Sequence, residues 1–280
     1  MKRTKSFNNE QPLLYLVATP IGNLKEMSNR ALEVLSDVDL IAAEDTRNTH
    51  SLLDKYGIKK PLFSLREHNE IEASNQIISM LKEGKKVAYV SDAGYPGISD
   101  PGQILVKKAI GEGIAVSTIS GPSAFLNALV SSGLETKHFY FYGFISPKDG
   151  EATKELEELK NKKETIIFYE APHRIGRTLK LLYSVLGDRK AIIARELTKL
   201  NEEYIRGTLK ELSEIDESTL IGEMVVIVEG EQESQEVSID TLKARVDSLV
   251  SRGVQLKTAI EITSEEYNVK KNDLKKLFFK

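Results

Sequence analysis

Acidic and basic side chains stand next to one another at three places in the sequence where an apolar, strand-like run ends. These clusters are Glu44 to Arg47, Tyr169 to Arg174 and Ala194 to Lys199. A carboxylate can take the proton of a hydroxyl nucleophile, and an arginine can hold a phosphate or orient that carboxylate. Together with an aspartate from a later loop, the candidate catalytic residues are Asp45, Arg47, Asp100, Glu170 and Arg195. For each arginine a structural ion pair carries equal weight.

Three loops that contain glycine or proline also follow predicted strands, at residues 19–23, 91–102 and 120–124. Glycine lets the backbone approach a ligand closely, and proline makes a loop rigid. In open α/β sheets, ligands bind beyond the carboxyl ends of the strands. We therefore expect one shared cleft, and its candidate cofactor-binding residues are Pro20, Gly22, Asp92, Gly94, Tyr95, Gly97, Ser120, Gly121, Ser123 and Ala124.

Ordinary strand-to-helix turns are the alternative, and they are favoured for residues 19–23 taken alone. The 91–102 loop argues otherwise, because it holds three glycines, two prolines and two aspartates, more than a turn needs. None of the loops matches the dinucleotide fingerprint or the phosphate-binding loop with its lysine. A ligand made of adenosine and an amino acid, without phosphates, is consistent with that absence.

The elements that must position these loops alternate in the first half of the chain. Predicted strands cover residues 13–17, 40–43, 62–65, 87–90 and 115–119. Helices are expected after Ser28, after an N-cap at Thr49, and over residues 70–82 and 104–110. This alternation is typical of βαβ units and predicts a largely parallel sheet.

A second α/β domain is expected to follow Gly121-Pro122. Its predicted helices are 123–130, 151–162 and 173–185, and its predicted strands are 139–142, 165–169, 191–195, 203–207 and 224–228, the last closing the sheet. Residues 229–236 form an acidic linker to three short helices that resemble a helix-turn-helix bundle. The predicted domains are therefore 12–121, 122–232 and a helical segment at 238–280.

Composition limits the possible functions. The 280 residues include no cysteine and only four scattered histidines, so we expect no disulfide, thiol nucleophile or metal site. No apolar run is long enough for a membrane helix and no secretory signal is recognisable, so a cytoplasmic location is expected. The net charge of −3 means that RNA binding would need local patches or an RNA held in a larger particle. Lys271, Lys275 and Lys276 could form such a patch, although a solvated lysine face explains them equally simply.

Six ordered segments carry a family resemblance: residues 16–24, 43–47, 91–102, 121–124, 168–174 and 194–199. Together they resemble the tetrapyrrole-methylase superfamily of S-adenosylmethionine enzymes and, within it, the branch that methylates small-subunit ribosomal RNA. The resemblance runs from about Leu14 to Gly230 and shows no departure in these motifs.

The resemblance implies a homodimer of two-domain α/β subunits that bind S-adenosylmethionine in the cleft between the domains. It also implies methyl transfer to the ribose 2′-hydroxyl of a cytidine in the decoding region of 16S rRNA in the small ribosomal subunit. Other functions stay open: a methylase of a tetrapyrrole or protein substrate on the same fold, or a non-catalytic RNA-binding module. A nicotinamide-dependent dehydrogenase is disfavoured by the missing fingerprint.

Overall fold

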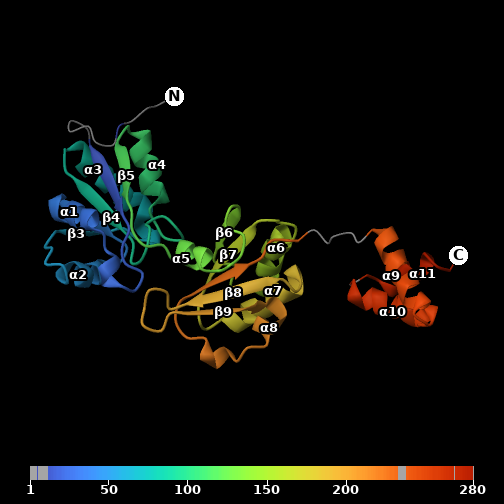
Figure 1. Ribbon diagram of the computed structural model, residues 1–280. Coiled ribbons are helices and arrows are strands. Elements are labelled where there is room, and N and C mark those ends of the chain that lie inside the picture. Colours follow the sequence, from blue (N-terminus) through green and yellow to red (C-terminus); the bar gives the residue numbers. More distant parts are fainter. Residues whose placement is uncertain (1–4, 6–11, 233–237, 268, 280) are drawn as a thin grey trace. The chain divides into compact units, whose positions relative to one another are not determined.

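The computed structural model describes residue 5 and residues 12–232, 238–267 and 269–279, and the chain forms two compact units (Figure 1). The first unit extends to Glu231 and the second begins at Gln232. The first unit contains two five-stranded sheets, and the second is helical. This architecture confirms the predicted fold class, whereas the boundary near Gly121-Pro122 inside the first unit stays a prediction.

The first sheet is entirely parallel, in the strand order β3-β2-β4-β1-β5. Its strands are β1 (Leu13–Val17), β2 (Leu40–Ala43), β3 (Leu62–Ser64), β4 (Val87–Val90) and β5 (Ala115–Ile119). The predicted βαβ alternation is confirmed. Because all five strands run in the same direction, the loops that follow them meet at one edge of the sheet.

Helices cover both faces of this sheet. They are α1 (Asn29–Asp37), α2 (Thr46–Asp54), α3 (Glu70–Lys82) and α4 (Gln103–Gly111), with short 3-10 turns at Leu24–Glu26 and Glu67–Asn69. Central β4 is buried on both sides: Val87 and Tyr89 pack with α3 and α4, while Ala88 and Val90 pack with α1 and α2. A strand buried on both faces needs a continuous apolar sequence, and this one has it.

The capping prediction is confirmed for α1 and wrong for α2. Ser28 accepts a hydrogen bond from the Ala31 backbone N–H at 3.2 Å, as a helix N-cap does. Thr49 was expected to cap the next helix, but it lies buried inside α2. Asp45 is the N-cap instead, because its carboxylate accepts a hydrogen bond from the Arg47 backbone N–H at 2.8 Å.

The second sheet mixes parallel and antiparallel pairs in the order β6-β7-β10-β8-β9. Its strands are β6 (Phe139–Gly143), β7 (Thr165–Glu170), β8 (Lys190–Arg195), β9 (Glu203–Thr208) and β10 (Met224–Val228). The expectation that residues 224–228 close the sheet is wrong, since β10 lies in the middle, antiparallel to β7 and β8. All five of its residues are buried, as a central strand requires.

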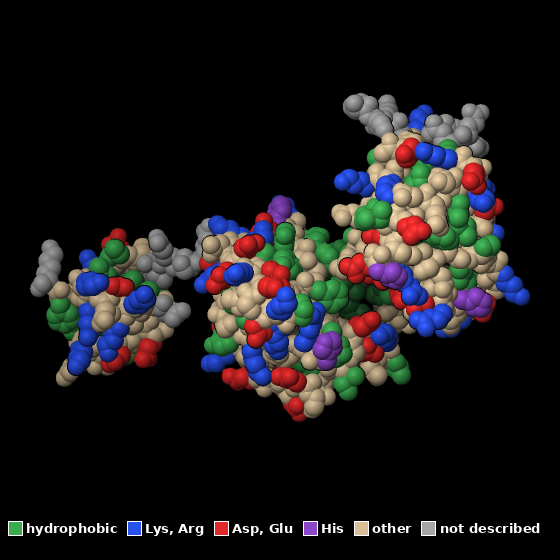
Figure 2. Space-filling view, turned by 180° about the vertical axis from the view of Figure 1, so that it is seen from behind, with side chains coloured by type: hydrophobic (Ala, Val, Ile, Leu, Met, Phe, Trp, Pro, Cys, Tyr) green, Lys and Arg blue, Asp and Glu red, His purple; other side chains and the backbone are tan. Residues whose placement is uncertain are grey.

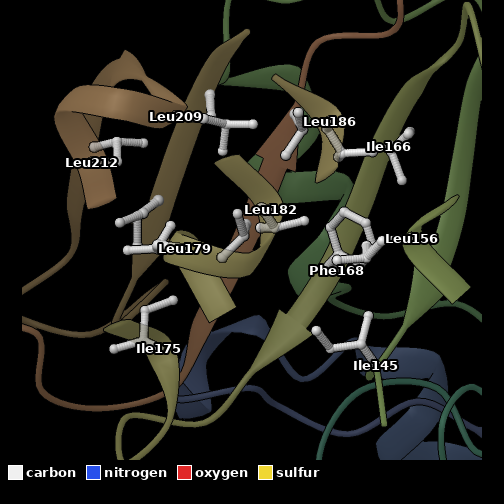
Figure 3. Close-up of a cluster of buried hydrophobic side chains, with 14 of the residues drawn as sticks. Ile145, Leu156, Ile166, Phe168, Ile175, Leu179, Leu182, Leu186, Leu209 and Leu212 are labelled. Carbon is white, nitrogen blue, oxygen red and sulfur yellow. The ribbon is translucent and has the colours of Figure 1, made fainter. Parts of the chain in front are cut away.

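The core of this sheet lies beneath α6 (Asp149–Leu159), α7 (Ile175–Leu186) and α8 (Leu209–Ser213), as Figure 3 shows. The other face is covered by α5 (Ala124–Val130), and a 3-10 turn lies at Glu217–Thr219. Helix α8 was not predicted, although Thr208 and Glu211 form the capping box that would have indicated it. Apart from α2, predicted and observed element ends differ by at most three residues.

The second unit contains the three predicted helices, α9 (Ile239–Ser251), α10 (Leu256–Glu266) and α11 (Lys271–Lys276). They pack around Leu242, Val246, Ala259, Ile260 and Leu274. Lys271 pairs with Glu261, and Lys276 pairs with Asp273 at 2.7 Å, so two of the three lysines of the proposed patch are partly neutralised. Residues 233–236 of the predicted linker lie outside the described residues.

Candidate active site

A cavity of about 410 Å³ opens in the first unit, and its walls come from both sheets. From the first sheet, the loops after β1, β2, β4 and β5 contribute Ile21, Glu44, Asp92, Ala93, Gly94, Tyr95, Ile98, Ser99, Asp100, Ser123, Ala124 and Phe125. The remaining wall consists of Phe144, Tyr169, Glu170, Ala171, Pro172, Leu197, Glu223, Met224 and Val225. Figure 2 shows the first unit hollowed, with hydrophobic side chains in the hollow. The volume suits a small-molecule ligand.

The structure brings seven of the predicted site residues to this cavity: Asp92, Gly94, Tyr95, Asp100, Ser123, Ala124 and Glu170. The others do not line it: Pro20, Gly22, Asp45, Arg47, Gly97, Ser120, Gly121 and Arg195. The expectation of converging loops is therefore met most fully by the 91–102 loop and by residues 123–124. A role of the other residues in binding or catalysis stays a prediction.

Two of the glycines outside the cavity wall hold loops close together. A Cβ atom at Gly22 would lie 2.6 Å from Cγ of Lys199, which belongs to the loop after β8. A Cβ atom at Gly121 would lie 2.9 Å from the Cβ atom of Ala18. Both distances are too short for carbon atoms, so these positions need glycine for packing between loops.

Hydrogen bonds fix the 91–102 loop at its beginning, middle and end. Thr19 and Gly94 exchange two backbone bonds of 2.9 and 3.0 Å, which ties this loop to the one after β1. The Tyr95 hydroxyl oxygen accepts a bond from the Gly121 N–H at 3.2 Å. At the far end, Glu70 accepts bonds from the N–H groups of Gly102 and Ile104, at 2.8 and 2.9 Å. Its carboxylate thereby caps α4 from another helix, a role that the sequence did not reveal.

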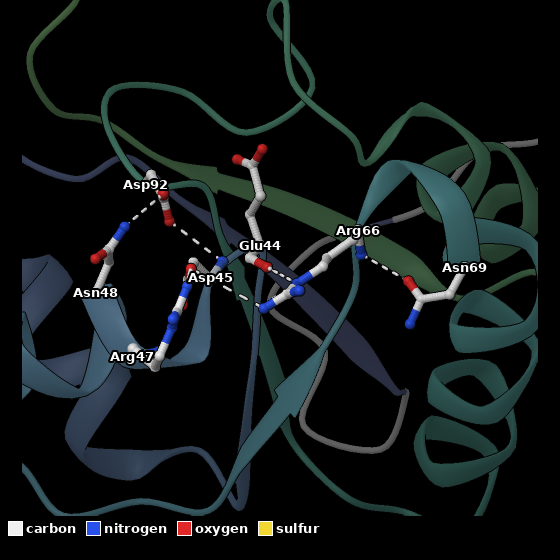
Figure 4. Close-up of polar contacts among 7 residues, drawn as sticks. All are labelled: Glu44, Asp45, Arg47, Asn48, Arg66, Asn69 and Asp92. Atoms are coloured by element: carbon white, nitrogen blue, oxygen red, sulfur yellow. Dashed lines mark hydrogen bonds and ion pairs between the residues drawn. The ribbon is translucent and has the colours of Figure 1, made fainter.

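Three carboxylic acids from the first sheet's loops, Glu44, Asp92 and Asp100, share one wall of the cavity. Burial and the nearby Glu44 and Asp92 carboxylates raise the pKa of Asp100 to about 7. A hydrogen bond from Ser91 acts in the opposite direction but is outweighed. Burial and the Asp92 charge also raise the pKa of Glu44. Asp92 accepts bonds from the Asn48 side-chain amide at 2.8 Å and the Asp45 backbone N–H at 3.2 Å (Figure 4). Carboxylates held together in this way favour a cationic ligand.

The Asp45 carboxylate is occupied by Arg47. Arg47 donates from Nε at 3.1 Å and from Nη2 at 2.6 Å, and Figure 4 shows the two side chains facing each other. This contact holds the pKa of Asp45 well below its usual range. The Arg47 side chain is 83% exposed, so the pair lies at the surface beside the cavity and not in its wall.

Glu170 and Arg195 are likewise held in ion pairs. The side chain of Glu170 is fully buried and accepts bonds from Arg174, from the Thr178 hydroxyl at 2.6 Å and from the Ala171 N–H at 2.7 Å. Arg195 donates to Glu203 at 2.5 Å and to the Ile221 carbonyl at 3.1 Å. Glu170 is therefore already paired with an arginine. Asp100, by contrast, is a predicted catalytic acid that lines the cavity and has no arginine partner among the described contacts.

The aromatic side chains Phe125, Phe144 and Tyr169 also line the cavity, and the sequence did not predict them as site residues. Tyr169 packs against Phe141 and Phe144, with ring centroids 5.1 and 5.6 Å apart, and Phe125 packs against Phe141 at 4.6 Å. The sequence does show an aromatic run that could have indicated this lining, Phe139-Tyr140-Phe141-Tyr142-Gly143-Phe144. Alternation alone does not determine which of its rings reach a ligand.

Comparison with known proteins agrees with this geometry. Residues 13–213 match the family described as Tetrapyrrole (Corrin/Porphyrin) Methylases. The chain belongs to this family. It is 44% identical over 283 residues to "Ribosomal RNA small subunit methyltransferase I" of Bacillus subtilis, covering 98% of this chain and 97% of the relative. The Haemophilus influenzae protein of the same name is also 44% identical and covers 94% of both chains.

Solved structures of the tetrapyrrole methylase family share the fold. Uroporphyrin-III-C-methyltransferase from Thermus thermophilus superposes with a TM-score of 0.55 at 17% identity, over 78% of this chain and 94% of that one. The methyltransferase CobJ gives a TM-score of 0.59 at 17% identity, over 79% and 95%. In the part of the chain that the structure describes, no helix is long and apolar enough to cross a membrane, and no acidic, histidine or cysteine group is arranged to hold a metal ion.

Proposed function

We propose that this tetrapyrrole methylase family member transfers a methyl group from S-adenosylmethionine to the ribose 2′-hydroxyl of a cytidine in the decoding region of 16S rRNA. The observation that carries the proposal is the agreement over nearly the whole chain with relatives named for small-subunit ribosomal RNA methylation. The cavity supports it, because its walls match the chemistry of a methyl donor.

The lining of the cavity fits S-adenosylmethionine better than a phosphorylated cofactor. Its described residues include five carboxylic acids and no Lys, Arg or His. Such a wall would repel a pyrophosphate, whereas it favours the positively charged sulfonium and amino groups of S-adenosylmethionine. The apolar wall at Leu197, Met224 and Val225 offers a surface for the adenine ring. When bound, the cofactor supplies a methyl group that is already activated by the positive charge on sulfur.

Asp100 is the group that we assign to proton transfer. Asp100 would accept the proton of the ribose hydroxyl as the ribose oxygen takes up the methyl group, and the electron pair of the broken S–C bond would stay on the sulfur of the donor. A base with a pKa near 7 is well suited to this task at neutral pH. The loops that carry Asp92, Gly94, Ser123 and Ala124 hold donor and acceptor in line, which supplies much of the remaining acceleration.

The acceptor in this proposal is RNA within an assembled small subunit, and the enzyme works as a cytoplasmic homodimer. A net charge of −3 gives little long-range attraction to a bare polyanion, so a particle that presents the target nucleotide in a fixed shape is favoured. The test is mass mapping of methylated nucleotides after incubation of purified enzyme with subunits and with naked transcript. Methylation of one cytidine ribose, faster on subunits, is expected; a methylated base, or none, would refute the proposal.

We also propose that the second unit is an RNA-docking module. Figure 2 shows Lys and Arg side chains gathered on one face of this unit. Lys271, with smaller contributions from Lys257 and Lys275, lowers the pKa of Glu261, so these three lysines lie near one carboxylate. Deletion of the residues after Glu236 should leave the Kd of the cofactor unchanged and raise the KM for subunits. Full activity of the truncated enzyme on subunits at physiological salt would show that the helices are only structural.

A further inference from the structure

Phe144 has an unusual position at the opening of the cavity. Of the large apolar side chains described along the cavity, Ile98 and Phe144 are the most exposed, at 41% and 50%. Leu197, Met224 and Val225, which line the same cavity, are at most 6% exposed. The ring therefore stands where the cavity meets solvent, a position from which it can contact an entering acceptor.

A β-bulge turns the Phe144 ring toward the cavity. The pairing of β6 with β7 shifts register between Phe141 and Gly143. In a regular strand, side chains 142 and 144 would share one face. Instead Tyr142 packs on Phe168, 5.7 Å between ring centroids, while Phe144 packs on Tyr169. Adjacent residues on β7 point to opposite faces, so the bulge moves Phe144 to the face that carries Tyr169 and the cavity.

The residues on either side hold Phe144 in this position. Gly143 has φ +85°, and a Cβ atom there would lie 3.2 Å from Oγ of Ser99, so this turn fits closely against the 91–102 loop. Ile145 is 2% exposed and anchors the chain in the core shown in Figure 3. With one neighbour fixed by the loop and the other by the core, the exposed ring has a defined direction.

An arginine lies beside this ring, outside the cavity lining. The guanidinium carbon of Arg174 lies 5.7 Å from the centroid of the Phe144 ring. Its Nε atom is bonded to the buried carboxylate of Glu170, which fixes the guanidinium group beside the ring. A flat aromatic surface next to a fixed cation is the arrangement with which proteins hold an unstacked nucleic-acid base.

We propose that Phe144, with Arg174 beside it, is the stacking surface for the base of the acceptor nucleotide. This inference rests on the proposed function and adds the site that receives the base. Its chemical reason is that a nucleotide drawn out of the RNA stack to bring its ribose into the cavity loses its stacking contacts, and an aromatic surface compensates for that loss. The carboxylic acids and the buried apolar residues of the cavity would then be left to hold the cofactor.

The test compares Phe144→Leu, which removes the ring and keeps an apolar side chain, with Phe144→Trp, which keeps an aromatic surface. Tyr140→Leu is the matched control, because Tyr140 is a 39% exposed aromatic on β6, the strand that ends just before Phe144, and does not line the cavity. Phe144→Leu should raise the KM for small subunits on the order of tenfold, the usual loss when one stacked base contact is removed. Phe144→Trp should stay within a few-fold of wild type, and calorimetry should give an unchanged cofactor Kd for all three variants.

Three results would overturn the proposal. An unchanged KM for Phe144→Leu, as expected for Tyr140→Leu, would show that no base stacks there. A cofactor Kd weakened by the same factor as the KM would assign the ring to the cofactor. If the wild-type enzyme transfers no methyl group to small-subunit RNA, the proposed function falls and the stacking role falls with it, whereas wild-type transfer with an unaffected Phe144→Leu refutes the stacking role alone.

Discussion

The first sheet brings Glu44, Asp92 and Asp100 to the cavity, whereas the second sheet brings Phe144, Tyr169 and a row of buried apolar side chains. The second sheet also contributes Glu170 and, just before β10, Glu223, but Arg174 and Lys199 pair with these charges. One wall is therefore electrostatic and made of loops, and the other is apolar and made of strand ends. In the proposed reaction the two walls divide the work: the first wall would attract a cation and accept a proton, and the second would receive flat rings.

The largest expected effect is on the electrostatic wall. Asp100→Asn removes the proton acceptor with little change in shape, so kcat should fall by roughly 10²- to 10⁴-fold, the usual contribution of a general base. In the wild type, kcat/KM should rise as the pH rises through about 7 and then level off, because the carboxyl group must lose its proton first. Initial rates across pH test both points; a variant that keeps the wild-type rate and pH profile would exclude Asp100 as the base.

The same substitution should act on stability in the opposite direction. The folded-state pKa of Asp100 is raised from 3.8 to about 7, so its contribution to stability is fully present below the unfolded-state pKa and lost as the pH rises through 7. An asparagine side chain does not ionise, so the Asp100→Asn variant avoids this loss of stability. Its Tm should exceed that of the wild type above pH 7, and the difference should shrink toward pH 4. A lower Tm at every pH would instead mean that Asp100 has a structural role.

The second prediction tests whether the loop backbone shapes the electrostatic wall. Gly94 has φ +74°, which a β-branched residue adopts only with strain, and it carries the paired bonds to Thr19. Gly94→Val should weaken cofactor binding roughly 10- to 100-fold, as a strain of about 1–3 kcal/mol is relieved by moving the loop. Calorimetry measures the Kd. Gly113→Val is the control, because its φ is +79° with open space around it and it lies outside the cavity lining, so it should lower Tm without changing the Kd.

The two walls also differ in how far the sequence could predict them. Parallel strands place their following loops at one edge, so the strand pattern was enough to predict that Asp92, Gly94, Asp100 and Ser123 would meet. The aromatic wall depends on a register shift at Gly143 and on Met224, which begins a strand inserted between two others. Neither the bulge nor the strand order leaves a periodic signal in the sequence.

The ion pairs were also difficult to predict from the sequence. The acid–base clusters were correctly located at strand ends, but adjacency in sequence could not distinguish a catalytic carboxylate from one already paired. Glu170 looked equivalent to Asp100 until its contacts with Arg174 and Thr178 were visible. The burial that raises the pKa of Asp100 is also a tertiary property, and the sequence alone does not contain it.

The third prediction concerns the cation behind the aromatic wall. Arg174→Gln leaves the fully buried Glu170 side chain without its cation, so the free energy of unfolding should fall by roughly 3 kcal/mol. Arg177→Gln, on the same helix, is the control: its partner Asp149 is 79% exposed, and the loss should stay below about 1 kcal/mol. Urea unfolding of both variants gives the comparison, and equal losses would contradict the view that Glu170 depends on Arg174.

The smallest effect is expected at Arg47, the exposed cation beside the electrostatic wall. Its pair with Asp45 lies at the surface, so Arg47→Gln should leave Tm and the cofactor Kd within error of wild type. If its guanidinium group contacts an RNA phosphate, the KM for subunits should rise a few-fold, and the slope of its logarithm against the logarithm of salt concentration should fall by about 1.

The salt dependence distinguishes Arg47 from the residues of the electrostatic wall, because the loss of a single phosphate contact changes the KM and its slope and leaves kcat alone. Lys82→Gln provides the matched control: Lys82 is half exposed and pairs with Glu112 at 2.6 Å, at the end of α3 and outside the cavity lining, so its slope should equal that of the wild type. A tenfold fall in kcat at unchanged KM would instead place Arg47 among the groups that act on the reacting atoms. The electrostatic wall would then include the Asp45–Arg47 pair as well as the three carboxylic acids.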